Sequence, residues 1–171
     1  MKMEMLMIQE NPTEKKKVNR RTAIRIAVDI MKVLRPYGRA KITGSLRRGK
    51  RQVSDIDLIG NNPAMMAEFL KLGEIIRGKP DGKQASIIKE DIQIDLWITP
   101  DESWNTMLMF TTGSMQENIW LRGIARRSFM VLNQWGLWLG PENRAKNLTE
   151  KDVYNILGVN YRRPSERKGW L

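Results

Sequence analysis

The chain has 171 residues, with 30 Lys or Arg against 19 Asp or Glu, so its formal net charge is +11 and its isoelectric point is near 10.1. This excess indicates a polyanionic partner, with nucleic acid first; an anionic membrane surface is the alternative, but no strongly amphipathic free helix supports it. Cys and His are absent, which excludes disulfides, thiolate or imidazole metal sites and His-based catalysis. Neither a membrane-length apolar run nor a signal-peptide core is present, so we expect a cytoplasmic protein that binds no membrane.

Residues 1–13, with Met at positions 1, 3, 5 and 7, are predicted to be a loosely held tail. Thr13 or a neighbour is expected to begin a helix that runs to about Leu34 and stops before Pro36. Its apolar residues share one side and should pack on a sheet: Ala23, Ile26, Ala27, Ile30, Val33 and Leu34. The opposite side is basic, and it is either a solvated face or a surface along a DNA backbone: Lys17, Arg21, Arg25 and Lys32.

The most informative stretch begins where the apolar run 40–43 ends at Gly44-Ser45. Gly permits backbone conformations closed to other residues and lets a ligand approach closely. Because Arg47 and Arg48 follow at once, backbone N–H groups and guanidinium groups meet at one turn. That combination suits a phosphate chain.

Three aspartates are expected to gather beyond this turn. Asp55 and Asp57 lie two residues apart on a predicted strand over 55–59, so their side chains point to the same face. Asp95 lies in a second alternating run, 92–98, which should pair beside the first. Adjacent carboxylates repel unless a hard cation such as Mg²⁺ lies between them. Three of them can hold two metal ions roughly 4 Å apart, the arrangement used for phosphoryl transfer.

The remaining elements follow from pattern. A helix is predicted from about Pro63 to Ile76, and a hairpin from the runs 85–89 and 92–98. Pro100 and Asp101 mark a boundary. Beyond it we expect helices over 102–110 and 114–127, a hairpin over 129–139, and a last helix capped by Thr149 and ended by Gly158. Glu150 and Asp152 lie in the first turn of that helix, where acidic residues favour the helix dipole.

Several motifs together resemble those of the family X DNA polymerases, within the nucleotidyltransferase superfamily. The similar segments, in family order, are Gly-Ser-Leu-Arg-Arg-Gly at 44–49, Asp-Ile-Asp-Leu at 55–58, Gln-Ile-Asp-Leu at 93–96, Pro-Asp-Glu-Ser-Trp at 100–104, Phe-Thr-Thr-Gly-Ser at 110–114, Leu-Asn-Gln-Trp-Gly-Leu at 132–137 and the tail 149–164. The resemblance implies an α+β fold: a nucleotidyltransferase-type palm with a mixed or antiparallel sheet flanked by helices, plus a small α+β C-terminal subdomain. We accordingly expect a tail at 1–13, a catalytic palm at 14–101 and a nucleotide- and template-binding subdomain at 102–171.

The resemblance also implies roles for the site residues. Asp55 and Asp57 would bind both of two Mg²⁺ ions, for which Mn²⁺ is an expected substitute. Asp95 would bind the catalytic ion and accept the proton of the primer 3′-hydroxyl. Ser45 and Arg48 would contact the triphosphate of the incoming nucleotide, and Gly44 would form the tight turn.

The segment from Phe110 onward lies where the family places the incoming sugar, which implies nucleotide contacts by Phe110, Thr111, Gly113 and Ser114. Thr111 replaces a second aromatic residue that is common in the family, so strong exclusion of ribonucleotides is not implied. By resemblance, Asn118 would contact the minor-groove edge of the incoming nucleotide and Arg122 the template side. A solvated helix face is the alternative for both.

Larger family members carry an N-terminal lyase domain and helix–hairpin–helix DNA clamps, and too few residues precede the first predicted helix for either. The chain resembles the very small members known from viruses, so we expect no lyase activity and a monomer. Its basic surface should hold gapped or primer–template DNA, with binding that weakens steeply in salt. The candidates are Lys17, Arg21, Arg25, Arg126, Arg127, Arg162 and Arg163.

Three functions are consistent with these residues. The first is a template-directed DNA polymerase that fills short gaps during DNA repair, with deoxynucleoside triphosphates as substrates. The second is a template-independent nucleotidyltransferase that extends nucleic-acid ends. The third is a non-catalytic nucleic-acid-binding remnant, which the retained aspartates argue against.

Overall fold

The computed structural model describes residues 16–167, so the predicted tail and Thr13 lie outside the described residues. Its largest sheet has the strand order β2 (Ala40–Ile42), β4 (Asp55–Gly60), β7 (Ile92–Ile98), β6 (Gln84–Lys89) and β5 (Glu74–Arg77). Strands β4 and β7 are parallel, whereas the other three pairings are antiparallel. The predicted fold class, α+β with a mixed sheet flanked by helices, is therefore confirmed.

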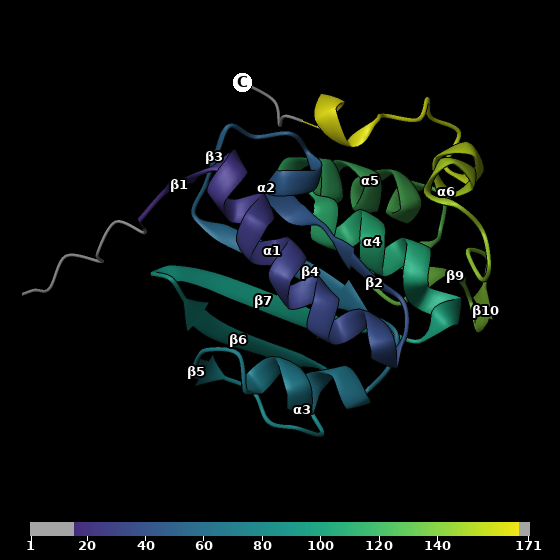
Figure 1. Ribbon diagram of the computed structural model, residues 1–171. Coiled ribbons are helices and arrows are strands. Elements are labelled where there is room, and N and C mark those ends of the chain that lie inside the picture. The colour runs from purple at the N-terminus through teal and green to yellow at the C-terminus, as the bar shows by residue number, and fades with distance from the viewer. Residues whose placement is uncertain (1–15, 168–171) are drawn as a thin grey trace, which may run out of the picture.

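Two helices cover one face of this sheet, α1 (Arg20–Leu34) and α3 (Ala64–Leu70), as Figure 1 shows. Strands β4 and β7 alternate buried and half-buried residues at their starts, so one face is apolar and the other polar. The main hydrophobic core forms between the apolar face and the helices, and it contains Ala23, Ile26, Ile30, Ile56, Leu58, Phe69, Ile94 and Leu96. The aspartates are therefore on the face away from α1 and α3.

The start of α1 differs from the prediction. Residues 16 and 17 are not helical, and Val18–Asn19 forms a short strand, β1, that pairs with β3 (Gln52–Val53). The Asn19 side chain caps the helix by accepting a hydrogen bond from the Thr22 N–H at 2.9 Å. The prediction was wrong for residues 16–19, which precede the helix, because an Asn cap and strand pairing compete with helix extension at residues 18 and 19.

The predicted helix over 63–76 was also wrong in its second half. Helix α3 ends at Leu70, and Glu74–Arg77 is the edge strand β5, in which Ile75 pairs with Ile87 of β6. Gly73 permits this close approach, because a Cβ atom there would lie 2.3 Å from the carbonyl oxygen of Ile88. The β-branched residues at 75 and 76 fit a strand beside an open sheet edge. The hairpin of β6 and β7 was predicted correctly.

The C-terminal half forms a second body of helices and a three-stranded sheet. Its elements are η2 (Asp101–Ser103), α4 (Trp104–Thr112), α5 (Met115–Arg127), β8 (Val131–Asn133), β9 (Gly136–Leu139), β10 (Glu142–Asn143), α6 (Glu150–Ile156) and η3 (Pro164–Glu166). The two predicted helices, the β8–β9 hairpin and the Thr149 cap are confirmed, whereas β10 was not predicted.

The two halves have separate cores joined by a third cluster. The C-terminal core includes Leu121, Ala125, Leu137, Val153 and Tyr154. The joining cluster packs Ile59 of the main sheet against Trp104, Met107 and Leu108 of α4. This division supports the proposed palm and C-terminal subdomains, whose boundary near residue 101 stays a proposal. In residues 16–167, no helix combines the length and apolarity needed to cross a membrane.

Candidate active site

The sheet register brings the three predicted aspartates to one face of two adjacent strands. Asp57 of β4 and Asp95 of β7 are direct partners in the parallel pairing, and Asp55 lies two residues before Asp57. All three are half-buried, whereas the intervening Ile56, Leu58, Ile94 and Leu96 are buried on the other face. The prediction that 55, 57 and 95 share a sheet face agrees with this register.

The Asp95 carboxylate is held by its neighbours. Gln93 Nε2 donates hydrogen bonds to Oδ1 at 3.0 Å and to Oδ2 at 3.2 Å. The Ser86 hydroxyl, on the adjacent strand β6, donates to Oδ1. Arg77 Nη2 lies 4.0 Å from the same oxygen, which makes Asp95 the centre of a small polar cluster.

The donor set suits a hard divalent cation, because carboxylate oxygens are the ligands that Mg²⁺ prefers. Among residues 16–167, however, no three acidic side chains are already close enough to form a metal-binding group. The backbone register thus provides three carboxylates on one face, and the Asp95 side chain is engaged by Ser86 and Gln93 instead of being gathered with the other two.

The turn at Gly44 packs directly against this face. It opens the short helix α2 (Gly44–Arg47), and the N–H of the preceding Thr43 donates to the Asp57 carbonyl oxygen at 2.8 Å. Gly44 has φ +59°, and a Cβ atom there would lie 1.9 Å from Asp57 Oδ2. Both the backbone conformation and the available space therefore require glycine beside this aspartate.

Two predicted phosphate contacts carry buried polar atoms that lack a partner. In the described part of the chain, Ser45 Oγ and Arg48 Nε are buried and accept or donate no hydrogen bond. Arg48 Nη1 donates to the Thr112 carbonyl oxygen, which anchors the guanidinium group between α2 and α4. Burial lowers the pKa of Arg48, although the nearby Asp57 and Asp55 charges oppose that shift. Unpaired buried polar atoms of this kind are expected where a ligand completes the hydrogen bonding.

The segment between α4 and α5 lies beside Arg48. A Cβ atom at Gly113, which has φ +63°, would be 3.3 Å from Arg48 Nη1. Ser114 caps α5 by accepting from the Glu117 N–H, and the Thr111 hydroxyl donates to the Met107 carbonyl oxygen at 2.8 Å. The Thr111 side chain is thus bonded to its own helix.

Phe110 contacts both Asn118, the predicted nucleotide contact, and Arg122, the predicted template contact. The Asn118 amide donates to the Phe110 carbonyl oxygen at 2.8 Å, and the Arg122 guanidinium lies 5.2 Å from the centre of the Phe110 ring. The ring also meets Trp97 edge to face, with centroids 6.2 Å apart. Trp97 extends from the same face of β7 as Asp95, so this aromatic pair connects the aspartate face of the sheet to helix α4. The predicted nucleotide contact of Asn118 and template contact of Arg122 stay predictions.

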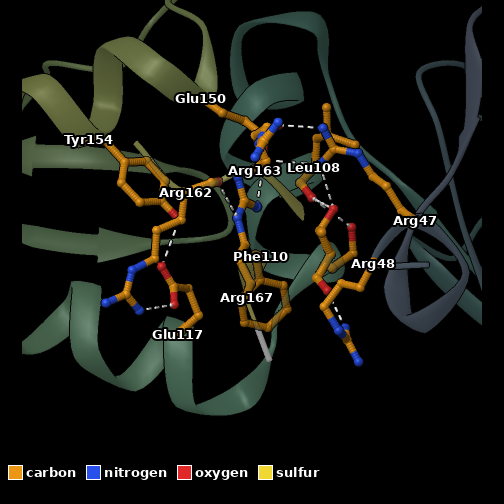
Figure 2. A network of polar contacts seen from close by, with 12 residues as sticks. Arg47, Arg48, Leu108, Phe110, Glu117, Glu150, Tyr154, Arg162, Arg163 and Arg167 are labelled. Carbon is orange, nitrogen blue, oxygen red and sulfur yellow. Dashed lines mark hydrogen bonds and ion pairs between the residues drawn. The ribbon is translucent and has the colours of Figure 1, made fainter. Parts of the chain in front are cut away.

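A buried ionic network behind the phosphate turn was missed by the sequence analysis. Glu150 Oε1 accepts from Arg47 Nη1 at 3.0 Å and from Arg167 Nη1 at 2.9 Å, as Figure 2 shows. Arg167 is fully buried and also donates through Nε to the Arg162 carbonyl oxygen. This network ties the turn after Gly44 to the start of α6 and to the end of the described chain.

Glu117 forms a second buried acidic centre in the same view. It is 2% exposed and accepts from the Tyr154 hydroxyl and from Arg162 Nη1, both at 3.0 Å. Burial raises the pKa of Tyr154, so its hydroxyl stays protonated and able to donate. Glu117 shares an apolar helix stripe with Leu121 and Ile124, and a charged residue on such a stripe is the sequence signal that could have identified it.

The predicted DNA contacts divide into two groups. Four of the seven lie in exposed positions of α1, its approach and α5: Lys17, Arg21, Arg126 and Arg127. The other three engage acidic side chains, namely Arg25 with Glu90, Arg162 with Glu117, and Arg163 with Glu166. A phosphate backbone would therefore have to compete with these carboxylates for Arg25, Arg162 and Arg163.

Comparison with known proteins finds that this chain is similar to a family model and to curated relatives. Residues 107–168 match the family model described as the DNA polymerase beta thumb. DNA polymerase lambda from Rattus norvegicus is 23% identical over 158 residues, a region that covers 72% of this chain and 28% of that relative. The chain thus spans little more than a quarter of the curated relative it matches.

Proposed function

We propose that the chain, which is similar to the family X DNA polymerases as its motifs predicted, is a template-directed DNA polymerase that fills short gaps in DNA. The observation that carries the proposal is the site itself. Asp55, Asp57 and Asp95 share a sheet face, and a glycine turn with unpartnered Ser45 and Arg48 atoms packs against that face. Carboxylates beside phosphate-binding groups are what nucleotidyl transfer requires.

Asp55, Asp57 and Asp95 would together hold the divalent cations, Mg²⁺ first and Mn²⁺ as a substitute. When bound, such ions supply positive charge that stabilises the attacking and leaving oxygens of phosphoryl transfer. Holding them requires the Asp95 side chain to face the other two carboxylates while keeping its bonds to Ser86 or Gln93.

The chain's own residues perform the remaining work. The Ser45 hydroxyl and Arg48 Nε bind and orient the triphosphate, and the buried position of Arg48 strengthens its attraction to phosphate oxygens. Asp95 accepts the proton that leaves the primer 3′-hydroxyl as its oxygen forms the new bond to the α-phosphorus. The bond from the α-phosphorus to the oxygen that bridges to the β-phosphate breaks, and pyrophosphate leaves. The proton acceptor lies on the sheet and the phosphate contacts lie on the turn after Gly44, so the reaction requires the turn to keep its position against the sheet.

The C-terminal subdomain is proposed to position the nucleotide and the template base. Phe110 and Gly113 border the sugar, with Thr111 and Ser114 beside them. Asn118 and Arg122 lie on the same helix, one and two turns beyond Ser114, and would read the new base pair. The exposed cations of α1, its approach and α5 are proposed to hold the DNA backbone: Lys17, Arg21, Arg126 and Arg127.

The test is insertion of single nucleotides into a duplex with a one-nucleotide gap, in Mg²⁺, with each base offered opposite each template base. The proposal predicts insertion that follows the template and falls at least about 100-fold in Asp55→Asn. Asp81→Asn, a change in an exposed loop acid, is the matched control and should keep the wild-type rate.

Two other outcomes favour the remaining functions. Insertion that ignores the template base would indicate an end-extending transferase, in which the subdomain carrying Asn118 and Arg122 does not read the pair. DNA binding with no insertion under any condition would indicate a nucleic-acid-binding protein. Either result contradicts the proposed polymerase.

A further inference from the structure

A single row of polar side chains crosses three strands toward the aspartates. Arg77 of β5 is the register partner of Ser86 of β6, and Ser86 is the register partner of Asp95 of β7. The row therefore continues to Asp57 of β4, the partner of Asp95. Register partners project from the same face of a sheet, so these side chains are placed to interact in sequence.

The hydrogen bonds along this row have a fixed direction. Arg77 Nε lies 2.7 Å from Ser86 Oγ, and Ser86 Oγ contacts Asp95 Oδ1. Arginine has only donors, and an ionised carboxylate has only acceptors. The Ser86 oxygen must therefore accept from Arg77, and its one proton is directed to Asp95.

The direction of these hydrogen bonds stays fixed because Ser86 is buried. Ser86 is fully buried, so its hydroxyl has no bulk water as an alternative partner, and the Asp95 side chain is only 13% exposed. Arg77 is 55% exposed and approaches from the open edge strand. A solvent-accessible cation thus fixes a buried hydroxyl, which in turn fixes one oxygen of a carboxylate in the candidate site.

We propose that Ser86 and Arg77 are positioning residues for Asp95: they hold the carboxylate in the orientation from which it binds a divalent cation and accepts the primer proton. This inference rests on the proposed function, because it takes Asp95 as a ligand and proton acceptor. Hydrogen-bonding partners behind a metal ligand commonly change metal affinity by 10–100-fold when removed. Both residues would act through Asp95 and would contact neither the primer nor the nucleotide.

A purely structural role predicts something different. If Ser86 only satisfies hydrogen bonds within the sheet, Ser86→Ala lowers stability and leaves cation affinity and the kcat–KM balance unchanged. Arg77 also has a direct electrostatic effect, because its charge lies 4.0 Å from Asp95 and opposes a cation there. A test must therefore separate the hydrogen-bonded relay from the charge.

A double-mutant cycle makes that separation. Mn²⁺ alone is titrated into the full chain without DNA or nucleotide, and bound ion is measured by electron paramagnetic resonance for wild type, Ser86→Ala, Arg77→Ala and the double variant. We expect Ser86→Ala to weaken Mn²⁺ binding about 10-fold. We expect the effect of Arg77→Ala on Mn²⁺ affinity in the wild-type chain to differ about three-fold or more from its effect in the Ser86→Ala chain. Arg77 can act through Ser86 only when Ser86 is present.

Two further readouts complete the test. In nucleotide insertion, Ser86→Ala should lower kcat while the KM for the nucleotide stays constant, because Ser45 and Arg48 bind the triphosphate. Ser86→Thr keeps the hydroxyl and should restore affinity and kcat. Lys79→Ala, which removes a neighbouring exposed charge that pairs with Asp81, is the control and should match wild type.

The outcomes distinguish this inference from the proposed function. Wild-type binding of Mn²⁺ that is lost in Asp55→Asn but unchanged in Ser86→Ala overturns the inference alone, as do strictly additive effects in the cycle. Absence of Mn²⁺ binding to the wild type overturns the cation site of the proposed function and the inference with it. Coupled loss of affinity with a selective fall in kcat supports the inference.

Discussion

Replacing Glu150 by Gln should destabilise the fold strongly. The Glu150 carboxylate is 7% exposed and accepts hydrogen bonds from two guanidinium groups, those of Arg47 and the fully buried Arg167. Glu150→Gln keeps the side-chain volume but removes the negative charge, which leaves two buried cations facing each other. Breaking a buried ion pair in this way costs about 3–5 kcal/mol. That loss is a large part of the roughly 5–15 kcal/mol that stabilises a typical domain.

The assay is denaturant unfolding at neutral pH, followed by tryptophan fluorescence and by circular dichroism. Glu166→Gln is the matched control, because it removes the same charge from an ion pair with Arg163 that lies in solvent. The control should leave the free energy of unfolding nearly unchanged. A Glu150→Gln variant within about 1 kcal/mol of wild type would refute the reasoning, since it would mean that the network contributes no more than a surface pair.

The Glu150 carboxylate should also make the free energy of unfolding depend on pH, and the direction of that dependence can be predicted. Burial would raise the pKa of Glu150, but the hydrogen bond from Arg47 and the charges of Arg167 and Arg47 outweigh burial and hold the pKa below its ordinary value. A depressed folded-state pKa contributes stability that is present above the unfolded pKa and is lost as the pH falls through the folded one. Wild type should therefore lose stability below about pH 4.5, and Glu150→Gln should lose less over that window.

Two further changes have defined outcomes. Gly44→Ala should lower the rate of nucleotide insertion at least about 10-fold and leave the circular dichroism spectrum unchanged. A Cβ atom at this position overlaps Asp57 Oδ2, and an L-residue at φ +59° costs about 1–2 kcal/mol. Insertion at the wild-type rate would contradict the packing of the turn on Asp57. Lys17→Ala should reduce the slope of log DNA affinity against log salt by about 0.9 if Lys17 contacts a phosphate. Lys71→Ala changes the residue directly after α3, a helix on the opposite side of the sheet from the aspartates, and should leave that slope unchanged. Equal slopes for both variants would show that Lys17 is not part of the DNA surface.

The aspartate face could be predicted from the sequence because strand periodicity is local. Asp55, Asp57 and Asp95 alternate with apolar residues along their strands, and this alternation indicates which face of each strand is buried. What periodicity alone could not give was the register between β4 and β7. Pairing Asp57 with Asp95 depends on a crossover through α3, β5 and β6, which sequence pattern does not specify.

The ionic network behind the turn could not be predicted in the same way. Glu150 was interpreted as a first-turn acid that favours the helix dipole, and Arg162 as a DNA contact. The structure buries Glu150 between Arg47 and Arg167, whereas Asp152 alone forms the capping box with Thr149. These partners are 103 residues apart in one case, so only the assembled fold brings them together. The boundary errors at α1 and α3 have the same origin, because strand pairing with β3 and β6 overrode local helix propensity.

The role of Asp95 is the central claim, and the single-turnover rate of nucleotide insertion by Asp95→Asn tests it most directly. The measurement uses a duplex with a one-nucleotide gap, saturating Mg²⁺ and the nucleotide that matches the template. Loss of a proton acceptor and a cation ligand predicts a fall of at least about 100-fold, with the circular dichroism spectrum of wild type retained. Insertion by Asp95→Asn at the wild-type rate would contradict the assignment of this sheet face as the site of nucleotidyl transfer.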